Sequence, residues 1–356
     1  MKLKDNPVYK KFIKHKLAIM GLMVIAVLYF LAVFADFLAP YPYDLQTREL
    51  FYQPPHKVHF IDRDSKILIR PYIYPYKLTD MMLNTYEEDK SVKVYIKFFT
   101  RSHEHKLLGF IPTRIRFFGV PEPYRVFIFG SDYLGRCTFS RLLYGSRISL
   151  SIGLIGDFIA FSIGILVGGI AGYFGGKTDN VIMRVTEIIM SFPSMYLIFA
   201  LRAGFPPDIS SVMVFLLITV ILSFAGWAGM ARIIRGMVLS IREEEFILGA
   251  KALGAGDMRI IVRHIIPNTL SYIIVSVTLS IPSYIIGEAA LSVMGLGIQE
   301  PFPSWGNMLS AARDLRVLTQ FSWILVPALA IFITVLSFNF VGDGLRDAVD
   351  PNRKKI

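Results

Sequence analysis

The chain has 356 residues, of which 54% are hydrophobic and 18% are charged. Soluble globular domains contain about 45–50% apolar and about 25% charged residues, so this balance excludes a disordered chain and argues against a soluble enzyme. A net charge of +11 in so apolar a chain indicates a membrane protein with basic cytoplasmic segments, not a nucleic-acid binder, and the single cysteine, Cys137, excludes an internal disulfide.

The N-terminal region predicts a membrane anchor. Residues 1–16 are rich in lysine and are expected to form a cytoplasmic N-terminus. Residues 17–38 follow as predicted transmembrane helix 1, because Leu17 to Ala35 carries no charge and can cross about 30 Å of hydrocarbon. A cleaved signal peptide is the alternative, but the apolar run exceeds a usual signal core and no small-residue cleavage site follows it.

Residues 39–147 differ in composition from the rest of the chain. They carry many charged, aromatic and proline residues, and the alternating pattern of residues 91–99 predicts a β-strand. We therefore expect a small, β-rich, extracytoplasmic insert.

The remaining predicted membrane spans lie within residues 148–342. Their expected limits are 148–173, 183–204, 210–231, 269–297 and 321–342. The short segments that face inside when the N-terminus is inside hold 18 of the 38 Lys and Arg residues, and the long insert, which does not set orientation, holds 16 more. The short opposite segments hold only Arg202, Arg313 and Arg316. The positive-inside rule therefore places the N-terminus and the 343–356 tail in the cytoplasm.

Several residues within the predicted spans are unusual. Gly164, Gly168 and Gly172 are spaced for close helix contact, most simply within the chain itself. Asp157 and Glu288 are ionisable at membrane depth and are candidates for a pore lining or gate, or for a packing contact. Pro193 and Pro282 are expected to kink or unwind their spans, and Pro282 joins the candidate gate residues.

No sequence pattern in the chain predicts a catalytic site or a phosphate-binding loop. Gly175-Gly176-Lys177-Thr178 resembles the end of a phosphate-binding loop, but Ala171 stands where that motif requires glycine. Neither a zinc-protease nor a nucleophile-elbow motif is present. We expect no catalytic residue, no metal site and no cofactor on this chain.

The loop at 232–268 is the longest predicted inside segment. Ser240 to Glu243 matches a capping box, which predicts a helix starting there, with an apolar stripe through Phe246, Ile247, Ala250 and Leu253. Residues 254–256 are expected to end this helix. Asp257 is expected to cap a second helix, 258–266, that ends at Pro267. The apolar stripe either packs on its own bundle or docks into another protein.

The stretch Glu245-Phe246-Ile247-Leu248-Gly249-Ala250-Lys251-Ala252-Leu253-Gly254, continued by residues 263–268, resembles the coupling loop of ABC importer permeases. The family usually has Glu-Ala-Ala where this chain has Leu248-Gly249-Ala250; Glu244 or Glu245 could compensate. Residues 130–150, 287–309 and 342–351 resemble segments of the second permease of oligopeptide and dipeptide importers, with Ser131 and Cys137 replacing the usual Thr and Asp.

The resemblance implies an all-α polytopic membrane protein with six transmembrane helices, like type I ABC importer permeases, with the β-rich insert between helices 1 and 2. Its expected partners are a homologous second permease, two ABC ATPase subunits that bind ATP and Mg, an extracytoplasmic substrate-binding protein and membrane lipid. The insert could contact that binding protein or form a structural cap over the pore. The ATPase-coupling residues it implies are Glu245, Phe246, Ala250, Leu253, Gly254, Ala255, Arg259 and Pro267.

The expected function is therefore half of the translocation pore of an ATP-driven peptide importer in the cell inner membrane. Because the subfamily also imports oligosaccharides and nickel, these cargoes remain alternatives. A secondary transporter driven by an ion gradient is a more remote alternative, since such proteins often show inverted repeats and the chain has no clear internal repeat.

Overall fold

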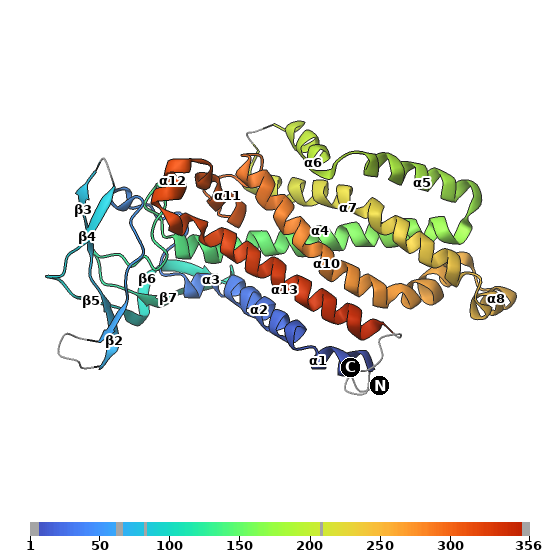
Figure 1. The fold of residues 1–356 in the computed structure, drawn as a ribbon, viewed down its shortest axis with the longest axis horizontal. Helices are drawn as coiled ribbons and strands as arrows, with labels where there is room; N and C mark the ends of the chain where they lie inside the picture. Colours follow the sequence, from blue (N-terminus) through green and yellow to red (C-terminus); the bar gives the residue numbers. More distant parts are fainter. Residues whose placement is uncertain (1–6, 62–66, 82–83, 207–208, 351–356) are drawn as a thin grey trace. The chain divides into compact units, whose positions relative to one another are not determined.

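The computed structural model describes residues 7–61, 67–81, 84–206 and 209–350. The chain divides into two compact units, described in turn below. The first unit comprises Met1–Ile25, Ser151–Leu291 and Ile333–Ile356, and the second comprises Ala26–Leu150 and Ser292–Phe332. Figure 1 shows the helices and strands with their labels.

Within the described residues, five helical segments are long and apolar enough to cross a membrane, or six if one bent helix pair counts as a span. The helices involved are α2 (Lys16–Val33), α4 (Thr138–Phe174), α5 (Gly176–Ser191), α6 (Ser194–Ala203), α7 (Ser211–Ile241), α10 (Ile266–Val293) and α13 (Val326–Val349). The expected helical membrane fold is confirmed. The helix α4 begins at Thr138, before the predicted start of its span, and α7 continues past the predicted end of its span.

The third predicted span is broken. The helices α5 and α6 meet at an angle of 86°, and the break falls at Phe192 and Pro193. The predicted effect of Pro193 is confirmed, since proline has no N–H to continue the helical hydrogen bonds and its ring clashes with the preceding turn. In contrast, Pro282 lies inside α10, which remains helical on both sides of it.

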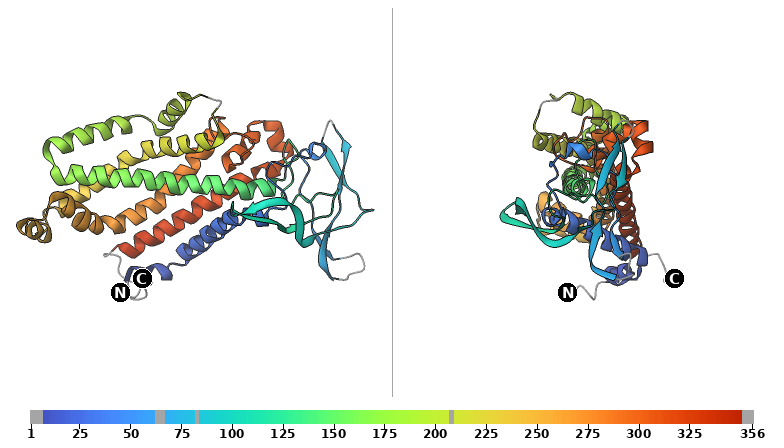
Figure 2. Two further views of the ribbon diagram at one scale, coloured as in Figure 1. Left: turned by 180° about the vertical axis from the view of Figure 1, so that it is seen from behind. Right: turned by 90° about the vertical axis from the view of Figure 1, so that its left-hand side faces the viewer.

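In the first unit, α4 and α7 are packed through a line of glycines. A Cβ on Gly168 would lie 2.3 Å from the carbonyl oxygen of Ala231, and one on Gly172 would lie 2.7 Å from that of Arg235. Only glycine permits so close a main-chain approach. Figure 2 shows α4 and α7 running beside each other. The glycine spacing therefore serves packing within this chain.

The second unit contains the β-rich region between α2 and α4, as expected. Its strands are β1 (His59–Ile61), β2 (Ile67–Ile73), β3 (Tyr76–Asp80), β4 (Thr85–Glu88), β5 (Val94–Tyr95), β6 (Lys97–Leu107) and β7 (Ile111–Gly119). Strand β2 pairs antiparallel with β1 and β5, whereas β3–β4 and β6–β7 are separate antiparallel hairpins. A core that includes Ile73 of β2, Val94 of β5, Phe118 of β7 and Phe127 packs the β1–β2–β5 sheet against the β6–β7 hairpin.

A buried ion network connects the start of α4 to the segment that follows α10. Arg136 and Arg141 are each 2% exposed, and both donate to Glu300. Arg136 also pairs with Asp132 at 2.7 Å. Burial alone would raise the pKa of Glu300, but the two guanidinium groups outweigh it and hold that pKa below its usual range. Two buried arginines are thus neutralised by two carboxylates.

His56 is expected to make the insert less stable in acid. Its buried ring accepts a hydrogen bond at Nδ1 from the backbone N–H of Phe127 at 3.0 Å, and burial lowers the pKa of His56 from 6.5 to about 4. The unfolded segment binds a proton on His56 more readily than the folded one does. The contribution of neutral His56 to the stability of the insert is therefore fully present at pH 7, and it is lost as the pH drops from about 6.5 towards 4. The loss should approach about 3 kcal/mol.

Hydrogen exchange of insert amides, corrected for the intrinsic effect of pH, should therefore quicken between pH 7 and pH 4.5. A His56→Gln variant keeps an acceptor for the Phe127 N–H but cannot titrate, so its corrected exchange should depend less on pH. Equal pH dependence in both proteins would show that His56 is not the cause.

Candidate functional site

The loop between α7 and α10 contains two short helices and a tight turn. Helix α8 (Glu245–Ala252) ends where Gly254 adopts φ +80, and α9 (Asp257–Ile260) follows. The Gly254 N–H donates to the Lys251 carbonyl at 2.9 Å, and the Ala255 N–H donates to the Ala250 carbonyl at 3.1 Å. This hydrogen-bond pair is the Schellman motif, which needs a left-handed residue that glycine supplies without strain. The predicted glycine stop is confirmed.

The predicted start of α8 is wrong. Helix α7 continues through Ser240 to Ile241, and α8 begins at Glu245 with Glu244 as its N-cap. Consequently, the Ser240–Glu243 capping box does not form. The reason is tertiary: Val238 is fully buried and Ile241 packs on the same hydrophobic cluster, which favours extending α7 through the polar residue between them.

The predicted end of the second helix is also wrong. Asp257 is the first residue of α9 and not its cap, and its side chain accepts a hydrogen bond from Tyr173. A π-helical turn, η3 (Ile261–Ile265), joins α9 directly to α10, so helical structure continues through Pro267. A π turn changes the hydrogen-bond spacing from i→i−4 to i→i−5, which suits a following residue that has no N–H to donate.

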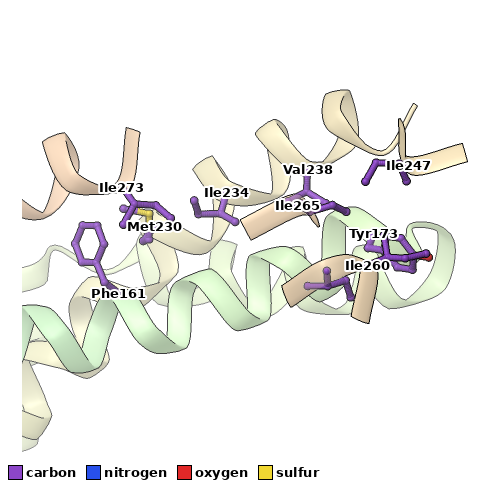
Figure 3. Close-up of a cluster of buried hydrophobic side chains, with 10 residues drawn as sticks. Phe161, Tyr173, Met230, Ile234, Val238, Ile247, Ile260, Ile265 and Ile273 are labelled. Atoms are coloured by element: carbon purple, nitrogen blue, oxygen red, sulfur yellow. The ribbon is translucent and has the colours of Figure 1, made fainter. Parts of the chain in front are cut away.

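The inner face of α8 packs on its own helical bundle. Ile247 is fully buried in a cluster with Val238, Ile260 and Ile265, and Ala250 packs against this cluster. Figure 3 shows Ile247 among these side chains, with Tyr173 nearby. Of the predicted apolar stripe, Ile247 and Ala250 therefore fix the loop to this chain.

The outer face of the loop is apolar and exposed. We use this name for four side chains, Phe246, Leu248, Leu253 and Met258. Leu253 is 90% exposed, and the other three are 47–54% exposed. A Cβ at Gly249 or Gly254 would meet no atom within 4 Å, so open space surrounds the backbone there. Clusters of exposed apolar side chains on folded proteins usually mark interaction sites.

The other predicted coupling residues lie at the edges of this outer face. Glu245, Arg259 and Pro267 are exposed, and Ala255 is half-buried. The departure from the family pattern at Leu248 falls on the exposed side of α8, so it alters the surface offered to a partner and not the packing of the loop.

Tyr173, near the end of α4, was not among the predicted site residues. Its hydroxyl donates to Asp257 Oδ1 at 2.7 Å, and its ring lies 4.8 Å from Lys251 Nζ. One tyrosine thus contacts both α8 and α9 and helps to set their position. A sequence signal that could have suggested it is the polar tip of a tyrosine placed at the end of an otherwise apolar span.

The predicted pore residues lie in the same unit, away from the exposed loop surface. Asp157 is 1% exposed and accepts a hydrogen bond from Ser280 at 2.5 Å, while its Oδ2 has no partner among the described residues. It lines a groove of about 510 Å³ between α4 and α10, together with apolar side chains such as Phe158 and Phe161. Glu288 is fully buried, and Pro282 is also buried. Their role in a pore stays a prediction.

Comparison with known proteins adds to this geometry. Residues 164–355 match the family described as binding-protein-dependent transport system inner membrane component, and residues 8–55 match the N-terminal TM domain of oligopeptide transport permease C.

Several curated proteins are similar to the chain. The dipeptide transport system permease protein DppC of Bacillus subtilis (strain 168) is 42% identical over 228 residues, which cover 64% of this chain and 69% of that protein. The oligopeptide transport system permease protein OppC of Haemophilus influenzae is 43% identical, covering 63% of this chain and 70% of that protein. The glutathione transport system permease protein GsiD of Escherichia coli O6:K15:H31 is 45% identical, covering 64% of this chain and 72% of that protein.

Among solved structures, an inward-facing conformation of the MetNI methionine ABC transporter aligns with a TM-score of 0.45 and 20% identity. The alignment covers 59% of this chain and 97% of that one.

Proposed function

Because the chain belongs to the family of binding-protein-dependent transport system inner membrane components, we propose that it forms half of the translocation pore of an ATP-driven importer of dipeptides or oligopeptides. The dipeptide and oligopeptide permeases among its relatives support this cargo class, and glutathione, named for a third relative, is itself a peptide.

The exposed outer face of the α8–α9 loop is the observation that carries the proposal. A fixed inner face and an exposed apolar outer face suit a short helix that transmits force between two proteins. The partner here is an ATPase subunit. ATP and Mg bind to that subunit, and closure of two such subunits moves the loop and, through α7 and α10, the pore.

The proposed complex also includes a homologous second permease and a substrate-binding protein on the opposite side of the membrane. Since the ATPases are cytoplasmic, the loop, the N-terminus and the C-terminus face the cytoplasm, in agreement with the distribution of Lys and Arg. The β-rich region is then extracytoplasmic. Alternating access requires the nucleotide to favour one conformation over the other, and the loop provides the contact through which it does so.

Transport by the reconstituted complex tests this function. Proteoliposomes containing this chain, the second permease and both ATPases should accumulate a radiolabelled dipeptide when the binding protein is outside and ATP is inside. A non-hydrolysable ATP analogue should abolish uptake, whereas an ionophore that collapses ion gradients should not. Uptake driven by an ion gradient without ATP would overturn the proposal. ATP-driven uptake of nickel or an oligosaccharide, but not peptide, would overturn only the cargo.

A further inference from the structure

The β6–β7 hairpin has two faces of different character. Its strands pair antiparallel, with Thr100 opposite Arg116 and Arg101 opposite Ile115, so successive side chains point to opposite sides. Arg116 and Phe118 are buried, and Phe118 belongs to the core of the insert. The other side of β7 carries Ile115 and Phe117, with Thr113 further along the strand.

This second side, with the hairpin tip, forms an exposed apolar surface. We call it the hairpin surface, and its members are Phe99, Leu108, Phe110, Ile111, Ile115 and Phe117. Phe110 is 70% exposed and Phe99 is 65% exposed, although both are large aromatic side chains. Such a surface is costly in water and usually has a partner.

The hairpin is attached to the end of the first membrane span. The backbone N–H of Leu108, at the tip, donates to Asp36 Oδ2 at 3.2 Å. Asp36 belongs to α3 (Ala35–Leu38), which directly follows α2, and it pairs with Arg147 at 2.8 Å. Arg147 in turn donates to the carbonyls of Ala32 and Val33 at the end of α2.

Aromatic contacts strengthen this attachment. The ring of Phe37, in α3, lies 6.1 Å from that of Phe99 and 5.8 Å from that of Phe117. Figure 2 shows the hairpin beside α3. The hairpin surface is therefore held beside α3 and the end of α2.

The charges around the hairpin surface are mostly positive. Lys97, Arg101 and Lys106 are exposed on β6, while Arg114 on β7 pairs with Glu104. Exposed aromatic and aliphatic side chains at the end of a span, bordered by basic groups, have the composition that binds a bilayer interface containing anionic lipid.

We propose that the β6–β7 hairpin lies in the membrane interface, with the hairpin surface among the lipid head groups and the ends of the acyl chains. The hairpin then anchors the insert to the bilayer beside the first span. This inference needs only that α2 spans the membrane, and it holds whichever cargo is transported.

Spin labelling in nanodiscs tests the proposal. Cys137 is the single cysteine and can be replaced by alanine, after which Phe110→Cys and, as a matched control, Phe60→Cys receive a nitroxide. Phe60 is 58% exposed on β1, outside the hairpin surface. In nanodiscs containing phosphatidylglycerol, the label at position 110 should collide readily with oxygen. Its collision rate with a water-soluble nickel chelate should be several-fold lower than that of the label at position 60.

Two outcomes would overturn the proposal. Equal access of the nickel chelate to both labels would mean that the hairpin surface faces water. Protection of the label at 110 from both oxygen and the chelate would mean that protein covers it. The paired change Arg101→Glu with Lys106→Glu should increase chelate access at position 110 if the basic border binds anionic lipid, and unchanged access would contradict that part.

A measurement on the unsubstituted chain tests the proposal without depending on whether the variants fold. Hydroxyl-radical footprinting in the same nanodiscs should modify Phe60 while sparing Phe99, Phe110 and Phe117. Modification of all four phenylalanines to a similar extent would contradict the proposal.

Discussion

Replacing Leu253 by aspartate should abolish ATP-driven transport while leaving the chain inserted in the membrane. Leu253 is the C-cap of α8, is 90% exposed and belongs to the outer face of the loop, so the substitution costs the isolated chain little. In the assembled importer it would place an unpaired carboxylate in an apolar contact, at a cost of several kcal/mol, about 2–5. Co-purification of the ATPase subunits and ATP-driven uptake should both fall by at least about tenfold, since about 1.4 kcal/mol corresponds to that factor.

A matched control separates docking from general damage. Leu315, in α12 (Leu315–Gln320), is also an exposed leucine on a short helix, at 72% exposure, but it lies far along the chain from the loop. Leu315→Asp should therefore leave ATPase co-purification unchanged. If Leu253→Asp also retains the ATPase and transports normally, Leu253 does not dock.

Gly254→Pro should have the same effect for a different reason. Proline cannot adopt φ +80, and it removes the N–H that closes the turn onto Lys251. Gly254→Ala should be milder, costing about 1 kcal/mol, because an L-residue can enter the left-handed region at that cost.

Replacing Gly168 by alanine should strongly destabilise the helical bundle, although the change adds a single methyl group. The new Cβ would lie 2.3 Å from the Ala231 carbonyl oxygen and 2.9 Å from its Cα, so α4 and α7 must separate. Overpacking of this kind typically costs about 1–3 kcal/mol, and here the obstruction is backbone, which cannot move aside as a side chain can. Thermal unfolding of the purified chain in detergent should show a clearly lowered midpoint.

The adjacent residue provides the control. A Cβ on Gly169 would meet only Ile261 Cγ2, at 3.5 Å, which is an ordinary contact. Gly169→Ala should therefore leave the midpoint unchanged or raise it, since alanine favours a helix over glycine by about 1 kcal/mol. Equal destabilisation by the two substitutions would show that close packing of α4 on α7 does not determine the difference.

Local signals predicted those parts of the loop that depend on local geometry. Gly254 ends α8 because only its left-handed conformation closes the Schellman turn, and Pro193 breaks a span because it lacks an N–H. Both properties belong to a single residue type. The alternating pattern at 91–99 predicted one strand, but the structure divides it between β5 and β6, with Ile96 outside both strands and residues 91–93 not in a strand.

Tertiary packing decided the parts that were wrong. The Ser240–Glu243 capping box is a sound local signal, but burial of Val238 and packing of Ile241 extend α7 through it. Similarly, Pro267 follows a π turn that no short-range pattern indicates. The sequence could not show which residues of the apolar stripe of α8 pack on this chain and which stay exposed. In the structure Ile247 packs inward, whereas Leu253 is exposed.

The glycine contacts between α4 and α7 also determine which substitutions the protein can tolerate during evolution. At Gly168 and Gly172 every possible replacement adds a Cβ against main chain, so neither position has a tolerated neighbour one mutation away. On α7 the facing residues Ala231 and Val238 already carry side chains, and a smaller residue at the buried Val238 would leave a cavity instead of a main-chain clash. Tolerance across this interface should therefore be unequal: a change of size at Val238 costs packing energy, whereas any side chain at Gly168 or Gly172 pushes the two helices apart.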